Sequence, residues 1–306
     1  MKILVTGTKG QVVTSVVEAA ARLRGAELIT LGRPEFDLTE PLAIKEAIVA
    51  AKPDIVISAA AYTAVDRAED EPDLAYAVNV VGAASVAEAA ASLRVPIIHL
   101  STDYVFSGEG RGPRREDDET RPHSVYGSTK LEGERAIASL TPHHIILRTS
   151  WVYSPFGGNF VKTMLRLAES RETLSVVSDQ YGCPTSALDL AAAILIIATQ
   201  PIRDRFGVYH LAGAGESNRS GFARQILAAS RRHGGPFADV RDIASADYPT
   251  KARCPQDSRL CTEKFEKTFG WHLPAWQIST ETVVQRILHQ DQSTTLPERR
   301  HSVKAR

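Results

Sequence analysis

The sequence has no excess of charge of either sign. It contains 36 basic and 36 acidic residues, so its formal net charge at pH 7 is zero. Domains that bind nucleic acid usually carry a basic patch, and anionic membrane surfaces attract the same kind of patch. The charge balance gives no sign of either partner, and we expect neither nucleic acid nor membrane to bind.

Cysteine is scarce and long apolar runs are missing. Cys183, Cys254 and Cys261 are scattered without a C-x-x-C pair, which argues against a disulfide framework or a zinc site. The longest apolar run, Leu190 to Ala198, is far shorter than the roughly 20 residues that span a membrane. The N-terminus reaches polar residues too soon for a signal peptide. We therefore expect a cytoplasmic protein with reduced thiols.

The first half of the chain alternates between strand and helix patterns. Near-continuous apolar runs, typical of strands buried on both faces, cover residues 2–6, 26–31, 54–60, 96–102 and 143–150. Helical patterns separate them, the first from about Gln11 to Arg24. This alternation predicts a Rossmann-like, doubly wound parallel sheet in an α/β fold. Asp37 or Thr39 is expected to cap the second helix.

From about Trp151 onward the alternation weakens, and proline, glycine and serine become more frequent. We expect residues 1–155 to form the sheet domain, with later crossings near residues 185–212. Residues 156–289 are expected to form mainly a smaller C-terminal lobe that binds substrate. Residues 290–306 are polar and aperiodic, which predicts a disordered tail.

Small, hydroxyl-bearing or aromatic residues follow four of the predicted strands. The sequences there are "TGTKG", "AAYTAVD", "STDYVFSG" and "RTSWVY". Ligands of an open parallel sheet bind beyond the carboxyl ends of its strands. A purely structural sheet needs turns at these places but not this accumulation, so the pattern favours one shared site.

The first of these segments is a glycine turn that opens a helix. Gly7 and Gly10 would allow a pyrophosphate to approach the backbone, with its charge at the helix N-terminus. The motif is imperfect because Val13 stands where a third glycine would fall. A plain strand–helix turn remains the alternative interpretation, although the position at the start of a βαβ unit favours a dinucleotide.

The end of the second strand normally selects between NAD and NADP. An acidic residue there holds the ribose hydroxyls, whereas an arginine suits a 2′-phosphate. This sequence has Gly32 and Arg33, which favours NADPH while leaving NADH possible. Arg33 could also be an exposed loop residue. Asp37 and Leu38 follow, either flanking an adenine or, for Asp37, capping a helix.

Tyr126 and Lys130 lie four residues apart where a loop turns into a helix, and would share one helix face. The spacing alone carries little weight, but the helix follows the strand that ends at Thr102. An ammonium beside a phenol would lower the pKa of Tyr126 from about 10 and make it a general acid toward a carbonyl oxygen. Lys130 would also reach the nicotinamide ribose, and Thr102 would hold the substrate oxygen.

A series of motifs along roughly residues 1–288 resembles the dTDP-4-dehydrorhamnose reductases of the extended short-chain dehydrogenase/reductase superfamily. The motifs run in order: "TGxxGQ", "AAYTAVDRAEDEP", "STDYVFSG", "VYGSTKLEGE", "LRTSWVY", "FVKTMLRLA", "DQYGCPT", "VYHLAG", "FAR" and "YPTKARCPQDSRL". The resemblance implies NAD(P)H-dependent reduction of the 4-keto group of dTDP-4-dehydro-L-rhamnose to dTDP-L-rhamnose, for cell-surface polysaccharide. The partner would be this nucleotide sugar.

The resemblance also implies roles for individual residues. Tyr126 would be the proton donor and Lys130 its partner, while Thr102 and Asp103 contact the sugar and Trp151 packs against the substrate. The cofactor would be lined by Gly10, Gln11 and Val12 along the pyrophosphate, Asp37 and Leu38 near the adenine, and Ala61, Tyr62 and Thr63 along the loop after the third strand. Asn79 would support the lysine through a water molecule.

Some positions depart from the family pattern. Ser15 stands where some relatives have a glutamate that bridges a dimer through magnesium, so we expect no metal and either a monomer or a homodimer. Lys251 stands where a proline is common. Gly32 stands where some members have an aspartate, which weakens a preference for NAD.

Two other functions stay open. Nucleotide-sugar dehydratases and epimerases share the fold and the Tyr/Lys pair, but dehydratases place two acidic residues after the strand-end threonine, and here Asp103 is followed by Tyr104. A non-catalytic NADP-binding regulatory subunit, like that of methionine adenosyltransferase, is suggested by Val13 and opposed by the presence of Tyr126 and Lys130. Arg259 either reaches a nucleotide phosphate or forms a surface ion pair.

Overall fold

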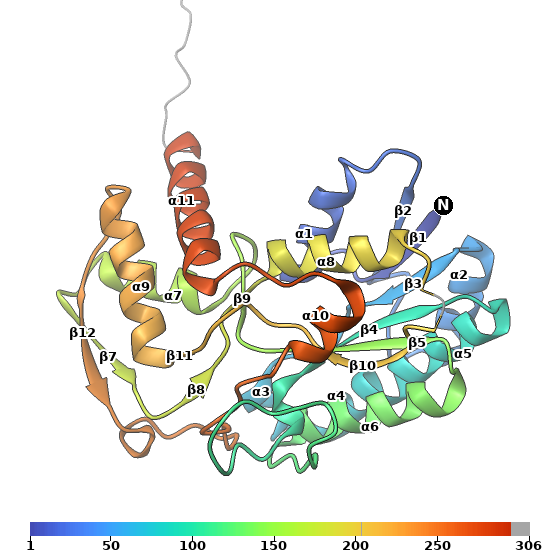
Figure 1. Cartoon of the computed structure of the whole chain (residues 1–306), viewed down its shortest axis with the longest axis horizontal. Coiled ribbons are helices and arrows are strands. Elements are labelled where there is room, and N and C mark those ends of the chain that lie inside the picture. The colour runs from blue at the N-terminus through green and yellow to red at the C-terminus, as the bar shows by residue number, and fades with distance from the viewer. Residues whose placement is uncertain (203, 295–306) are drawn as a thin grey trace, which may run out of the picture.

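A six-stranded parallel sheet forms the larger lobe of the protein (Figure 1). The computed structural model describes residues 1–202 and 204–294. In spatial order the strands are β2 (Glu27–Leu31), β1 (Lys2–Thr6), β3 (Ile55–Ser58), β4 (Ile97–Thr102), β5 (His144–Thr149) and β10 (Gly207–His210). The chain order reverses between β1 and β3, which creates the crevice where ligands of such sheets bind. The doubly wound α/β fold predicted from the sequence is thus confirmed.

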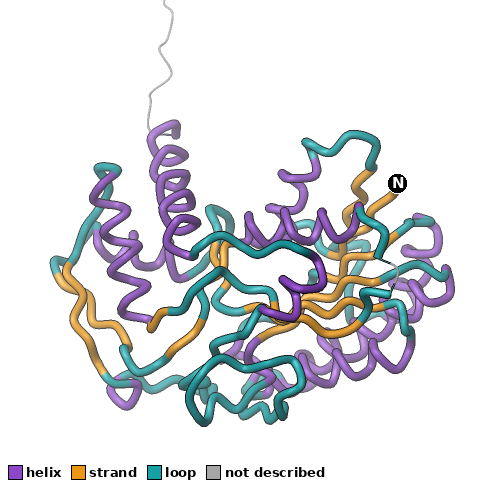
Figure 2. The backbone as a smooth tube through the Cα atoms, viewed as in Figure 1, coloured by secondary structure: helices purple, strands orange, loops and turns teal. Residues whose placement is uncertain are grey.

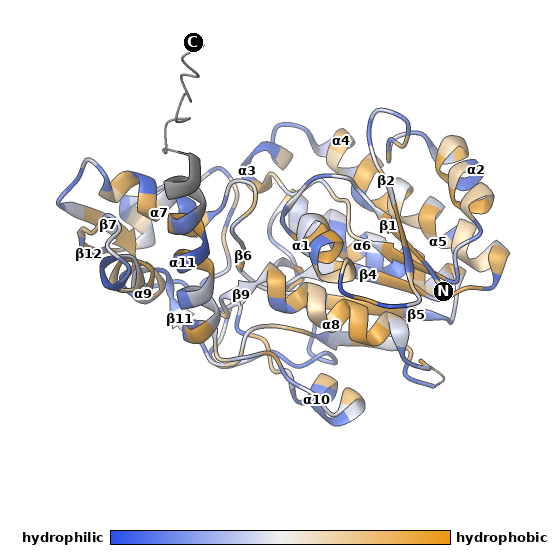
Figure 3. Cartoon of the chain, turned by 90° about the horizontal axis from the view of Figure 1, so that it is seen from above, coloured by the Kyte–Doolittle hydropathy of each residue, from blue (hydrophilic) through white to orange (hydrophobic). Residues whose placement is uncertain are grey.

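Helices cover both faces of the sheet because the strand side chains alternate between them (Figures 1 and 3). Ile3 and Val5 of β1 join one core with α1 (Gln11–Ala20) and α8 (Ala187–Thr199). Leu4 points to the other core, formed with α2 (Pro41–Ala51), α5 (Ala83–Leu93) and α6 (Val125–Leu140). All three of these side chains are at most 1% exposed, so both faces of the sheet are buried at this strand.

The remaining elements form a smaller lobe (Figure 2). Its core includes Tyr153, Phe222 and Trp276. Its elements are β6 (Val152–Tyr153), α7 (Phe160–Ala168), β7 (Thr173–Val177), β8 (Tyr181–Gly182), β9 (Thr185–Ser186), β11 (Ser217–Asn218), α9 (Arg219–Arg232), β12 (Asp239–Ile243), the 3₁₀ turn η3 (Ser245–Asp247) and α11 (Trp276–Thr294). The short helix α10 (Glu263–Phe269) returns to the sheet, where Phe265 joins the larger core. A division near residue 155 remains our proposal for the domain boundary.

One long helical run lies behind the site. It consists of α4 (Pro72–Tyr76), a π-helical turn η1 (Ala77–Gly82) and α5, and it follows the short helix α3 (Val65–Ala68). By length and composition alone this run, Pro72–Leu93, could cross a membrane, with a mean hydropathy of 1.4. However, 56% of its most apolar window is buried inside the protein, as in a core helix.

Three details differ from the sequence-based expectations. α1 ends at Ala20 rather than near Arg24. The proposed caps of α2 are wrong, because this helix begins at Pro41, and the carboxylate of Asp37 instead accepts hydrogen bonds from the N–H and hydroxyl of Thr39, both at 2.9 Å. The disordered tail is wrong for residues 290–294, which continue α11, and the rest of that prediction lies outside the described residues.

Candidate active site

The helix α6 presents Tyr126 at its first turn, and three residues determine where that turn lies. The Ser124 hydroxyl caps the helix by accepting the Gly127 N–H at 3.1 Å. The Glu69 carboxylate accepts the Val125 N–H at 2.9 Å, a second cap that the sequence did not suggest. A Cβ at Gly127 would lie 2.3 Å from the Tyr104 carbonyl oxygen, so only glycine permits this approach. The "SVYGSTK" segment is therefore seated directly on the turn that follows β4.

The end of β4 holds a hydrogen-bonded cluster beside Tyr126. The Thr102 hydroxyl donates to Asp103 Oδ1 at 3.1 Å and accepts the Tyr104 N–H at 3.2 Å. Ser150, after β5, donates to Asp103 Oδ2 at 2.9 Å. Asp103 is only 2% exposed, and this burial raises the pKa of its carboxyl. Asp103 thus orients Thr102 from behind, rather than facing the open crevice.

Tyr126 is held in its protonated form in this structure. Burial raises the pKa of its phenol to about 12, although a hydrogen bond with Thr102 acts in the opposite direction. Its ring packs edge-to-face against Tyr104, with 5.6 Å between ring centres. The expectation that Lys130 lowers the pKa of Tyr126 is wrong here, because desolvation of the phenol outweighs every other influence on it.

Lys130 points into the sheet, where its ammonium has two partners. It donates to the Leu100 carbonyl at 2.7 Å and contacts His99 Nε2 at 3.1 Å. His99 Nδ1 in turn lies 3.0 Å from the Ser58 hydroxyl. Lys130 is 2% exposed, and desolvation lowers its pKa to about 8. Burial, aided by the charge of Lys130, lowers the pKa of His99 as well, so a neutral imidazole accepts from the ammonium.

One turn further along α6, Glu134 forms a buried ion pair with Arg148. The guanidinium Nη2 lies 2.8 Å from Glu134 Oε2, and its Nε donates to both carboxylate oxygens. Both side chains are at most 5% exposed. Ser101 donates to the same carboxylate at 2.5 Å. This pair joins the helix that carries Tyr126 to strands β4 and β5, and sequence reasoning missed it.

Asn79 connects the loop after β3 to α6. Its side-chain oxygen accepts the Tyr62 N–H at 2.9 Å, and its amide donates to the Tyr62 carbonyl and the Thr129 hydroxyl, each at 3.1 Å. The phenol of Tyr62 donates to Glu71 at 2.6 Å. Asn79 therefore holds the loop that was predicted to line the cofactor, together with its neighbours Ala61 and Thr63, against the helix that carries Tyr126.

The glycine turn lies at the β1/β3 crevice, as predicted. Gly7 and Gly10 have φ angles of 103° and 110°, in the region that favours glycine. No side chain caps α1, so the N–H groups of its first turn, which include those of Gln11 and Val12, face outward unpaired by a cap. Val13 is buried in the core, where its methyl group fills the space beside Gly7.

The chain matches the family described as the RmlD substrate binding domain over residues 1–289. A dTDP-4-dehydrorhamnose reductase of Sinorhizobium fredii is 50% identical to it over 292 residues, which cover 94% of this chain and 98% of that protein. This chain belongs to the dTDP-4-dehydrorhamnose reductase family. It is an NAD(P)H-dependent oxidoreductase of that type, as the motifs predicted.

Solved structures of dTDP-4-dehydrorhamnose reductases share the fold. The enzyme from Clostridium acetobutylicum is 36% identical with a TM-score of 0.88, covering 94% of this chain and 100% of its own. The enzyme from Bacillus anthracis, solved in complex with NADP, is 31% identical with a TM-score of 0.85, covering 92% of this chain and 98% of its own.

Ser15 is buried on α1 of this reductase, and its hydroxyl donates to the Gln11 carbonyl at 2.7 Å. Within residues 1–202 and 204–294, no group of three or more His, Cys, Asp or Glu residues could hold a metal ion.

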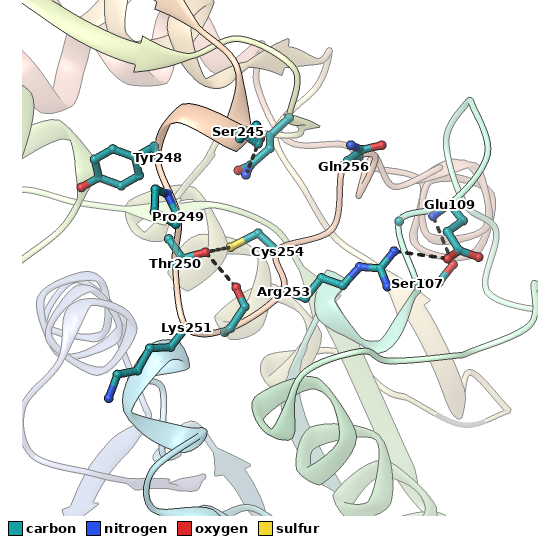
Figure 4. Close-up of a pocket in the computed structure, with 14 residues that line it drawn as sticks. Ser107, Glu109, Ser245, Tyr248, Pro249, Thr250, Lys251, Arg253, Cys254 and Gln256 are labelled. Atoms are coloured by element: carbon teal, nitrogen blue, oxygen red, sulfur yellow. Dashed lines mark hydrogen bonds and ion pairs between the residues drawn. The ribbon is translucent and has the colours of Figure 1, made fainter.

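A cavity of about 420 Å³ opens next to the predicted cluster of this reductase (Figure 4). The loop from Tyr248 to Gln256 forms much of its wall, together with Gln180, Ser245, Ala246 and the segment Ser107–Glu109. The Tyr104 hydroxyl contacts Sγ of Cys254, one of the lining residues, at 3.6 Å, which connects the cavity wall to the cluster. Sequence reasoning did not identify this loop as part of the site, because nothing in its spacing indicates which strand end it covers.

Proposed function

We propose that this protein reduces the 4-keto group of dTDP-4-dehydro-L-rhamnose to dTDP-L-rhamnose with NADPH. The observation that carries the proposal is the protonated Tyr126 phenol beside the Thr102 hydroxyl, at the carboxyl edge of the sheet. The relatives named for this activity, one of them solved with NADP, support it. The three cysteines are free thiols, in keeping with a cytoplasmic location, and we propose a monomer or a homodimer.

The chain has the features that a dinucleotide needs. The uncapped first turn of α1 and the positive φ angles of Gly7 and Gly10 form a site for a pyrophosphate, with Gln11 and Val12 alongside. We propose that Ala61, Tyr62 and Thr63 line the nicotinamide half and that Asp37 and Leu38 lie near the adenine. When bound, NADPH supplies the hydride.

In the proposed reaction, Tyr126 donates its proton to the carbonyl oxygen as that oxygen gains negative charge. Thr102 would bind the same oxygen by turning toward it the hydroxyl proton that it donates to Asp103 in this structure. Lys130, anchored by Leu100 and His99, keeps a positive charge beneath the site. Trp151 would form one side of the substrate pocket.

The dehydratase alternative requires a second acid after the strand-end threonine. Here Tyr104 occupies that place, and burial holds the pKa of its phenol well above its ordinary value. A neutral phenol that is hydrogen-bonded to Cys254 Sγ is a poor replacement for a carboxylate in the elimination of water. The geometry therefore favours reduction. The chain also has Tyr126, Lys130 and Thr102, and a non-catalytic binding subunit would be expected to lack some of them.

The direct test is to follow NADPH oxidation with dTDP-4-dehydro-L-rhamnose and wild-type protein. We expect turnover that depends on both reactants, and none with dTDP-glucose in the absence of NADPH. Binding of NADPH without any turnover of the keto sugar would support the regulatory-subunit interpretation instead. Elimination of water from dTDP-glucose would support the dehydratase.

The preference for NADPH is proposed to come from Arg33. This side chain is exposed at the end of β2. Hydrogen bonds from Thr39 lower the pKa of the nearby Asp37 carboxyl, and the charge of Arg33 adds to this effect. A Cβ at Gly32 would lie 2.8 Å from the Thr8 backbone nitrogen, so no acidic side chain fits where it would repel a 2′-phosphate.

Replacing Arg33 with alanine should raise KM for NADPH by about tenfold and leave KM for NADH nearly unchanged, because the lost contact is a charged hydrogen bond that only the 2′-phosphate makes. Steady-state kinetics with both cofactors measures this. Arg22→Ala, in the turn after α1, is a matched control. Equal effects of Arg33→Ala on both cofactors would contradict the assignment.

A further inference from the structure

Arg219, the first residue of α9, lies on the ring of Trp151. Its guanidinium carbon is 3.8 Å from the centre of that ring and 5.7 Å from the centre of Phe160. These are cation–π distances. Trp151 comes directly after β5, so the side chain reaches from the smaller lobe to the strand ends that carry Thr102 and Asp103.

Arg219 is also hydrogen-bonded to a residue of the cavity wall. Its backbone N–H donates to the Gln180 carbonyl at 3.2 Å, and Gln180 lines the cavity wall. On its other side, the positive charge of Arg219 acts to lower the pKa values of Asp103 and Tyr104, against the larger effect of their burial. Arg219 therefore lies where the strand-end cluster and the cavity meet.

The guanidinium of Arg219 has no ion-pair partner. Within the described part of the chain, no carboxylate lies within ion-pair distance of this guanidinium, and none of its N–H groups makes a side-chain hydrogen bond. Four other cations around the crevice and cavity each have an acidic partner: Arg148 with Glu134 at 2.8 Å, Arg259 with Asp257 at 2.6 Å, Lys251 with Asp70 at 2.5 Å and Arg253 with Glu109 at 3.5 Å. Arg219 alone among these five is free to bind an anion.

Arg259, which the sequence left as a candidate for a nucleotide phosphate, is already occupied. Its guanidinium donates to both carboxylate oxygens of Asp257 and, at 2.7 Å, to Glu216. These two acidic partners neutralise the charge of the Arg259 guanidinium and fix its orientation. An incoming anion would have to displace them, which makes Arg259 a structural ion pair.

We propose that Arg219 binds the diphosphate of the nucleotide-sugar substrate, an inference that rests on the proposed function for the class of substrate. The guanidinium presents its N–H donors as a planar fork that matches a phosphate. Stacking on the Trp151 ring fixes the orientation of the guanidinium before the ligand binds. This reduces the conformational freedom that the side chain loses on binding. The sugar then extends from Arg219 toward Thr102, and the nucleoside toward the cavity beyond Gln180.

The test compares thymidine, dTMP and dTDP as ligands by calorimetry, with wild-type protein, Arg219→Ala and Arg219→Lys. We expect the Kd for dTDP to rise about 10- to 100-fold in Arg219→Ala, as for the loss of hydrogen bonds to a charged group. Thymidine should bind equally well to all three proteins. The Arg219→Lys variant keeps the positive charge but not the planar arrangement of donors. Its loss of affinity for dTDP should therefore be smaller than that of Arg219→Ala. Arg166→Ala, an exposed arginine on α7, is the matched control.

Kinetics separates this role from an indirect one. If Arg219 binds the diphosphate, the alanine variant should raise KM for the keto sugar and change kcat little. A fall in kcat with unchanged dTDP affinity would overturn the proposal and show that Arg219 acts through Asp103 or Trp151. An equal loss of thymidine and dTDP binding would also overturn it. Arg219-dependent dTDP binding in a protein that turns over no keto sugar would reject the proposed function and leave this inference standing.

Discussion

Replacing Tyr126 with phenylalanine is expected to lower kcat for reduction of the keto sugar by about two to four orders of magnitude. The substitution removes the proton that the carbonyl oxygen must receive and keeps the ring that packs against Tyr104. Affinity for NADPH should change little, because the loss is confined to the transition state. NADPH oxidation at saturating substrate, with cofactor binding measured separately, gives the two quantities.

The pH dependence provides an independent check on the same assignment. With its pKa raised to about 12, the phenol of Tyr126 stays protonated throughout the neutral range, so its ionisation should not shape kcat/KM of the free enzyme below about pH 10. An alkaline fall near pH 8 would instead report Lys130, whose pKa is lowered to about 8. Tyr76→Phe, an exposed tyrosine on α4, should behave as wild type. Full activity of Tyr126→Phe would reject the proton-donor role.

Replacing Glu134 with alanine should destabilise the protein by about 3–5 kcal/mol, because it leaves the buried charge of Arg148 without a partner. Ser101 and Arg148 would together lose every hydrogen bond to the carboxylate. Urea unfolding measures the change in the free energy of unfolding, and activity of the remaining folded protein shows whether α6 has moved.

Two comparisons show whether this loss comes from the uncompensated charge. In the double variant Glu134→Leu with Arg148→Met, most of the stability should return, since a packed apolar pair replaces a buried ion pair without large cost. Glu263→Ala, which removes an exposed pair with Lys267, should have a far smaller effect than Glu134→Ala. A double variant as unstable as Glu134→Ala would contradict the explanation.

The sheet and the outline of the site were predictable because both depend on local patterns. Apolar runs such as residues 97–102 are buried on both faces, and only strands within a parallel sheet are buried in that way. Since all such strands end at one edge, the residues after them lie along that edge, and Thr102 and Tyr126 are hydrogen-bonded there. The order of the motifs along the chain indicated the family, which the spacing of residues in any single motif could not do.

The contacts that define the chemistry were not predictable from spacing. Tyr126 and Lys130 share a helix face, yet the phenol lies beside Thr102 while the ammonium turns into the sheet toward His99 and Leu100. Sequence spacing gives the face of a helix but not the depth at which each side chain ends. Arg219 was missed for a similar reason, because its partner Trp151 is distant in sequence and belongs to the other lobe.

The π-helical turn around Asn79 has a consequence for how the site tolerates changes in chain length. Successive residues of a helix are rotated by about 100°, so one residue more or fewer in Ala77–Gly82 would swing the Asn79 amide away from both Tyr62 and Thr129. The alignment of the loop after β3 with the helix that carries Tyr126 thus depends on the exact number of residues in a turn behind the active site. Substitutions there alter packing, whereas a single insertion or deletion alters the geometry of the reaction.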